Sequence, residues 1–137
     1  MRIAVMDGQG GRLGQNLVER ILAQIPDADL IAVGLNSQAT KSMIKGGAQE
    51  AATGENAAIV ACRHADVIVA PLGMAIADSL LGEVSPAVAA AVGGSRAHRV
   101  LIPMNMCNTY VPGVPQSSAV IIQDAIEYVK KLAGDDQ

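Results

Sequence analysis

The stretch Ile3-Ala4-Val5-Met6-Asp7-Gly8-Gln9-Gly10-Gly11-Arg12-Leu13-Gly14 decides the fold. A short apolar run is followed by four glycines within seven residues and then by the amphipathic stretch 15–25. This order predicts a strand, a glycine-rich turn and a helix. Glycine permits positive φ and close approach of the backbone to a ligand, and the N–H groups at a helix N-terminus favour an anion such as phosphate. The stretch therefore predicts a nucleotide-binding loop.

Further apolar runs alternate with helical periodicity along the rest of the chain. Strands are predicted at residues 2–7, 30–35, 48–52, 65–71 and 99–103, with a short edge strand at 109–112. Helices are predicted at 15–25, 37–44, 55–64, 75–81 and 86–92, and from Ser117 or Ser118 to Gly134. The predicted N-caps are Asn36 or Ser37 for the second of these helices, Thr53 for the third and Ser85 for the fifth. Such alternation implies right-handed crossovers and a parallel sheet. We expect one α/β domain over residues 1–137, a three-layer α/β/α Rossmann-like sandwich whose mainly parallel sheet has about five strands.

The composition narrows the function classes. Half of the residues are hydrophobic, yet there is no Trp or Phe and only two Tyr, so the core must be aliphatic, which suits a parallel sheet covered by helices. The net charge is −3 and no basic cluster is longer than Lys130-Lys131, which argues against a nucleic-acid partner. No apolar run reaches the roughly 18 residues of a membrane span. We expect no membrane partner, a cytoplasmic location and, from the weakly charged composition, a homo-oligomer.

Parallel α/β sheets bind ligands beyond the carboxyl ends of their strands. This rule selects four irregular segments, at residues 7–14, 36–37, 71–74 and 103–108. The expected ligand is a small-molecule nucleotide resembling NAD(P). The candidate cofactor-binding residues are Gly8, Gln9, Gly10, Gly11, Arg12, Leu13, Gly14, Asn36, Ser37, Pro71, Leu72, Gly73, Met74 and Asn105.

Several roles stay open at these positions. Asn36 stands where an NAD site usually offers a carboxylate to the ribose hydroxyls, and Lys41 could serve a 2′-phosphate. Asp7 beside a pyrophosphate would be repelled by roughly 1–4 kcal/mol; capping of the turn through the backbone is its favoured role, and binding of a hydroxyl or amine is the alternative. The catalytic candidates are Asp7, Asn105 and Cys107, although an inert role is favoured for Cys107. Cys62 and Cys107 lack metal-type spacing, so no metal site is predicted.

The run Gly-Gln-Gly-Gly-Arg-Leu-Gly at 8–14 fits a G-x-x-G-x-x-G pattern. In that spacing it resembles the N-terminal cofactor loop of the dihydrodipicolinate reductases, over some 20 residues. The resemblance implies a pyridine dinucleotide as cofactor. It also implies substrate groups on a second domain, so either a homo-oligomer completes the site across an interface or the protein is not an oxidoreductase.

A second resemblance rests on three blocks: Ala65-Asp66-Val67-Ile68-Val69-Ala70-Pro71, then Ile76-Ala77-Asp78-Ser79-Leu80-Leu81, and Ile102-Pro103-Met104-Asn105-Met106. They are similar to the flavin-dependent family that includes phosphopantothenoylcysteine decarboxylase. The resemblance implies FMN as an alternative cofactor, with Asn105 contacting substrate and 71–74 on the flavin side. The catalytic histidine of that family falls on Ala57 here, and the P-x-M-N run is one residue shorter.

A third resemblance extends over nearly the full length. Asp-Gly-Gln-Gly-Gly at 7–11, Ala-Thr-Gly-Glu-Asn-Ala at 52–57 and Leu-Ile-Pro-Met-Asn-Met-Cys-Asn at 101–108 look like an uncharacterised bacterial family, a small domain of unknown function. It implies no activity. Three functions therefore stand side by side: NAD(P)-like binding, FMN-dependent chemistry, and a non-enzymatic sensor or assembly protein whose glycine loop is only a turn.

Overall fold

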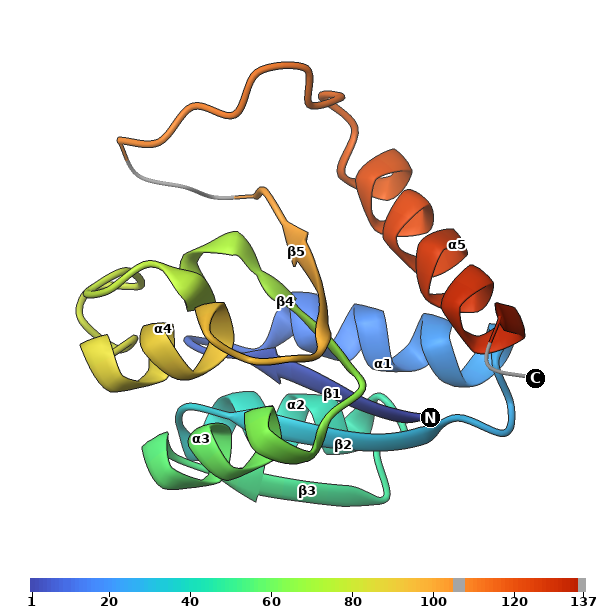
Figure 1. Ribbon diagram of the computed structural model, residues 1–137, viewed down its shortest axis with the longest axis horizontal. Helices are drawn as coiled ribbons and strands as arrows, with labels where there is room; N and C mark the ends of the chain where they lie inside the picture. Colours follow the sequence, from blue (N-terminus) through green and yellow to red (C-terminus); the bar gives the residue numbers. More distant parts are fainter. Residues whose placement is uncertain (105–107, 136–137) are drawn as a thin grey trace.

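The chain forms a sheet with helices on both faces (Figure 1). A computed structural model describes residues 1–104 and 108–135. The strands are β1 Arg2–Asp7, β2 Asp29–Gly34, β3 Glu50–Thr53, β4 Val67–Pro71 and β5 His98–Ile102. The helices are α1 Arg12–Gln24, α2 Ser37–Lys45, α3 Glu55–His64, α4 Pro86–Gly93 and α5 Ser118–Asp135, with a short 3₁₀ turn, η1, at Leu72–Ala75. The predicted alternation of strands and helices is confirmed.

All described strand pairs are parallel, and the strand order is β3-β2-β1-β4-β5. The chain thus builds outward from β1 to β3, then returns to the other side of β1 and continues to β5. The order reverses between β1 and β4, as in dinucleotide-binding folds. The predicted Rossmann-like sandwich with a five-stranded parallel sheet is confirmed.

Successive side chains of a strand point to opposite faces of the sheet, and β1 shows this clearly. Ile3 and Val5 belong to one buried cluster, which packs under α1, α2 and α5, whereas Ala4 and Met6 belong to a second cluster under α3 and α4. These four side chains are at most 1% exposed. Because β1 is buried on both faces, it reads as a continuous apolar run rather than an alternating one.

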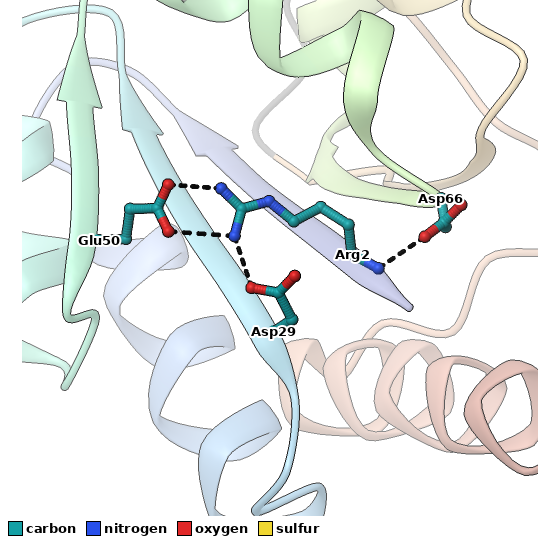
Figure 2. A network of polar contacts seen from close by, with 4 residues as sticks. All are labelled: Arg2, Asp29, Glu50 and Asp66. Carbon is teal, nitrogen blue, oxygen red and sulfur yellow. Dashed lines mark hydrogen bonds and ion pairs between the residues drawn. The ribbon is translucent and has the colours of Figure 1, made fainter.

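The edge of the sheet where the strands begin is held by Arg2, as Figure 2 shows. Its guanidinium donates to Asp29 Oδ1 at 2.6 Å and to both carboxylate oxygens of Glu50, at 2.5 and 3.1 Å. Its amide donates to Asp66 Oδ2 at 2.7 Å. One residue of β1 therefore links the starts of β2 and β3, and its backbone holds the residue just before β4.

Two predicted elements are wrong. Residues 75–81 do not form a helix; η1 ends at Ala75 and is followed by an irregular segment in which Asp78, Leu80 and Leu81 have positive φ. The amide of Asp78 donates to the carbonyl of Val84 at 2.8 Å, so a closed turn forms here despite the helical propensity of alanine and leucine. Residues 109–112 form no strand, because they pair with none of the described strands.

Smaller differences concern element ends. The α3 helix begins after Gly54, at φ 108°, rather than after a Thr53 cap, because the Thr53 hydroxyl pairs with that of Thr40 at 2.7 Å. The last helix runs one residue past Gly134. Asn36 and Ser85 do cap α2 and α4, through hydrogen bonds from the amides of Ala39 and Val88. Within residues 1–104 and 108–135, none of the helices combines the length and the hydropathy that crossing a bilayer would require.

Candidate functional site

The glycine loop, defined as residues 8–11, lies at the carboxyl end of β1, beside the point where the strand order reverses. The loop is closed by a hydrogen bond of 3.0 Å from the Gly11 amide to the Gly8 carbonyl. Gln9 and Gly11 take positive φ, 48° and 75°. The turn therefore needs the conformational freedom of glycine at 11, directly before α1.

Two glycines of the stretch are required by packing. A Cβ at Gly11 would lie 2.6 Å from Ala39 Cα, and one at Gly14 would lie 2.7 Å from Met43 Sδ. Both glycines let the start of α1 approach α2 closely. Gly10 differs, because nothing lies within 4 Å of the place where its Cβ would stand and its φ is not positive. The fold itself does not demand glycine at position 10.

Asp7 ends β1 and is 6% exposed. Its Oδ1 accepts from the Gly8 amide at 2.8 Å, and its Oδ2 accepts from the Gly14 amide at 2.7 Å. The favoured prediction for Asp7, backbone capping of the turn, is therefore confirmed. The pKa of Asp7 is raised, mainly by burial. The two amide hydrogen bonds lower it, and the nearby Glu83 carboxylate raises it further.

Glu83 reaches the same place from the connection between β4 and α4. Its Oε1 accepts from the Gln9 amide at 2.6 Å, and its Oε2 accepts from Asn36 Nδ2, also at 2.6 Å. Asn36 donates in addition to the Gln9 carbonyl at 2.9 Å. A Cβ at Gly8 would collide with the Glu83 carboxylate, so the glycine at this position makes room for it. The end of β2 thus meets a carboxylate that comes from elsewhere in the chain.

A cavity of about 200 Å³ opens at the glycine loop. It is lined by Asp7, by residues 8–13 and, on the other side, by Pro71, Leu80 and Met104. Larger cavities lie elsewhere, including one of about 370 Å³ between α3 and α4 and one of about 400 Å³ beside β5 and α5. Neither contains the glycine loop, so we place the candidate site by chemistry and topology rather than by volume.

The structure brings together only part of the predicted site. Asp7, the stretch 8–13 and Pro71 line one cavity. Gly14 is buried beneath it, and Asn36 reaches the loop only through Gln9 and Glu83. Like Gly14 and Asn36, four further predicted residues do not line this cavity: Ser37 is exposed at the start of α2, Leu72 is half-buried, and Gly73 and Met74 are buried, Met74 within the second core cluster. The predictions for Asn105 and Cys107 lie outside the described residues.

Glu83 and Leu80 are site residues that sequence reasoning missed. Both follow β4 within the connection that the sheet rule selects, but that connection was predicted to contain a helix over 75–81. The partners of Glu83, Gln9 and Asn36, lie 74 and 47 positions away in the chain, so no local pattern marks it. In the part of the chain that the structure describes, no three His, Cys, Asp or Glu side chains gather as a metal site would require.

A family model described as a domain of unknown function (DUF3842) matches residues 2–134. The chain belongs to this family. The resemblance to a family of small domains of unknown function, stated from the sequence, is therefore confirmed. A search of curated proteins found no match.

One solved structure is similar to the DUF3842 chain, a dodecameric FMN-dependent UbiX-like decarboxylase from Escherichia coli O157:H7. The sequences are 15% identical, the alignment covers 98% of this chain and 94% of the other, and the TM-score is 0.49.

Proposed function

We propose that the DUF3842 chain binds a nucleotide-type small molecule over the crevice between β1 and β4. The observation that carries this proposal is the position of the glycine loop, which lines a cavity where the strand order reverses. Pro71, Leu80 and Met104 line the same cavity. Ligands of open α/β sheets bind at this switch point because the loops on its two sides diverge.

Gly10 supports a ligand over a purely structural turn. Neither packing nor backbone conformation requires glycine there, whereas close approach of a ligand to the backbone does. Among the described residues, the amides of Arg12 and Leu13 at the start of α1 have no acceptor. Arg12 is exposed and lies in the same turn. These amides and this cation suit a phosphate group.

The leading ligand class is a pyridine dinucleotide, NAD or NADP, and FMN is the alternative that the sequence resemblance implies. Thermal shift and isothermal titration with NAD, NADP, FMN, ATP and S-adenosylmethionine separate these options. With no Trp and two Tyr, the chain absorbs little near 280 nm, so copurified nucleotide would dominate its ultraviolet spectrum. Copurified flavin would colour the sample yellow.

Gly10→Glu tests the site. The new side chain would enter the space over the loop without meeting the fold, because nothing lies within 4 Å of that Cβ. Gly93→Glu is the matched control, since its Cβ also meets nothing within 4 Å and it lies at the end of α4. We expect ligand binding to be lost in Gly10→Glu and kept in Gly93→Glu. Absence of binding by any of the five compounds, or full affinity in Gly10→Glu, would overturn the proposal.

We propose in addition that the chain forms a homo-oligomer. Large apolar side chains lie exposed at Leu81 (98%), Tyr110 (86%) and Val120 (55%). The segment 108–117, between β5 and α5, arches away from the sheet and its helices (Figure 1). Contact with a second copy would cover such groups. Size-exclusion chromatography with light scattering measures the subunit number, and a monomer at all concentrations would contradict this expectation.

A further inference from the structure

The segment 76–85, named here the Glu83 segment, lies between η1 and α4 and covers part of the glycine loop. It is folded on itself, because the Asp78 amide donates to the Val84 carbonyl at 2.8 Å and the Val84 amide donates to the Ser79 carbonyl at 3.1 Å. Val84 is fully buried and anchors the segment to the second core cluster. The segment touches the candidate site through two side chains, Glu83 and Leu80.

The backbone of this segment is strained. Asp78, Leu80 and Leu81 have φ of 68°, 56° and 57°, a left-handed conformation that is unfavourable for residues other than glycine. Leu81 is 98% exposed, so burial of its own side chain does not offset that cost. Strain of this kind persists where surrounding contacts hold it and often marks functional segments. Here the surrounding contacts include the hydrogen bonds that the Glu83 carboxylate accepts from Gln9 and Asn36.

The Glu83 carboxylate stands in a set of donors suited to an anionic oxygen. The Gln9 amide and Asn36 Nδ2 each approach one of its oxygens at 2.6 Å. No cation pairs with Glu83 or with Asp7 among residues 1–104 and 108–135. The two carboxylates repel each other, which raises the pKa of Asp7.

The cavity is also too small for the expected ligand. Its volume of about 200 Å³ falls below the roughly 300–1,000 Å³ of typical ligand pockets. A dinucleotide needs more room at the loop, and Leu80, which lines the cavity, belongs to the Glu83 segment, which is neither strand nor helix. Movement of this segment would open the space above Gly8 and Gln9.

Resting on the function proposed above, we infer that Gln9 and Asn36 form an anionic subsite that Glu83 occupies until a phosphate group of the ligand replaces it. Glu83 is thus an internal competitor for this subsite. The apparent affinity for a phosphate-bearing ligand is the intrinsic affinity multiplied by the fraction of molecules in which the subsite is open. If one molecule in about ten is open, removal of the Glu83 carboxylate strengthens binding about tenfold.

The test compares the full chain with Glu83→Ala and Glu83→Gln by isothermal titration with AMP, NAD and adenosine. Glu127→Ala is the matched control, because it removes the same charge from a half-exposed position on α5. We expect Glu83→Ala to bind AMP and NAD about tenfold more tightly than the unmodified chain, and Glu83→Gln to gain as well. The gain should be absent with adenosine and absent in Glu127→Ala.

The opposite results are equally informative. Weaker binding of NAD by Glu83→Ala would overturn the inference, because Glu83 would then be contacting the ligand. Unchanged affinity would overturn it too, since Glu83 would have no competing role. Both results leave the proposed function standing, whereas no binding of any nucleotide by the unmodified chain and all three variants contradicts the proposed function itself.

Hydrogen exchange gives a second readout on the unmodified chain. Saturating NAD should speed exchange of the Asp78 and Val84 amides, whose hydrogen bonds hold the Glu83 segment together. Slower exchange would mean that the segment closes over the ligand, which contradicts displacement of Glu83.

Discussion

Oε1 of Glu83 accepts a hydrogen bond from the amide of Gln9 at 2.6 Å, although 74 positions separate the two residues in the chain. The connection after β4 and the loop after β1 therefore meet across the crevice where nucleotide ligands of this fold class bind. This contact holds the Glu83 segment against the glycine loop at the candidate site.

Substitution by alanine should change the free energy of unfolding far more at Gly11 than at Gly10. In Gly11→Ala the new Cβ would lie 2.6 Å from Ala39 Cα, and the residue would keep φ near 75°. We expect the free energy of unfolding to fall by at least about 1–2 kcal/mol from backbone strain alone. Gly10→Ala, whose Cβ meets nothing within 4 Å, should change it by less than about 0.5 kcal/mol. Urea denaturation measures both, and equal losses would contradict the described loop conformation.

Asp7→Asn should destabilise the turn. An amide side chain can accept from only one of the two backbone amides that Asp7 now satisfies, and its NH₂ would face the other. A buried donor without an acceptor costs about 1–3 kcal/mol. Asp27→Asn is the control, because Asp27 is exposed in the turn before β2. Equal denaturation midpoints for the two variants would show that Asp7 does not cap the loop.

Arg2→Met should make the stability of the fold less sensitive to acid. The hydrogen bonds from Arg2 lower the pKa of Glu50, so the stability they provide is present above the ordinary glutamate pKa and is lost as pH falls below it. The variant lacks these hydrogen bonds, so protonation of Glu50 in acid costs it no stability. Thermal melts between pH 3 and 7 should converge at low pH, and the difference at neutral pH should shrink in high salt. Parallel melting curves at all pH values would refute this interpretation.

Cys62 should resist alkylation in the folded chain. It is 3% exposed, and burial raises the pKa of its thiol to about 11, so the reactive thiolate is scarce near pH 8. Iodoacetamide labelling of Cys107→Ser, read by mass spectrometry, isolates Cys62. We expect labelling only when urea unfolds the chain. Rapid labelling without urea would mean that α3 opens easily or that the thiol is more acidic than its surroundings indicate.

Local sequence patterns predicted the framework well. The apolar run of β1, the spacing of the α1 side chains and the caps Asn36 and Ser85 each depend on neighbours within a few residues. The capping role of Asp7 was also accessible, because its partners Gly8 and Gly14 belong to the same turn. These signals persist because tertiary contacts reinforce the local preference rather than oppose it.

The contact between the Glu83 segment and the glycine loop could not be predicted from local patterns. The residues 75–81 carry helical propensity, but a turn closed between Asp78 and Val84, and anchored by the burial of Val84 in the core, overrides it. The partner of Glu83 is an amide in a distant loop, and a backbone amide has no residue-specific signature in the sequence. The absence of an acidic residue at the end of β2 was visible in Asn36, but the Glu83 carboxylate that Asn36 contacts became visible only once the chain was folded.

The central claim is that a nucleotide binds over the glycine loop at the β1–β4 crevice. Backbone amide NMR of the ¹⁵N-labelled chain tests it most directly, by titration with NAD, NADP, FMN, ATP and S-adenosylmethionine in turn. We predict that at least one of these compounds shifts the resonances of residues 8–13 together with those of Leu80 and Glu83. No shift with any compound, or shifts confined to the cavity between α3 and α4, would contradict the claim.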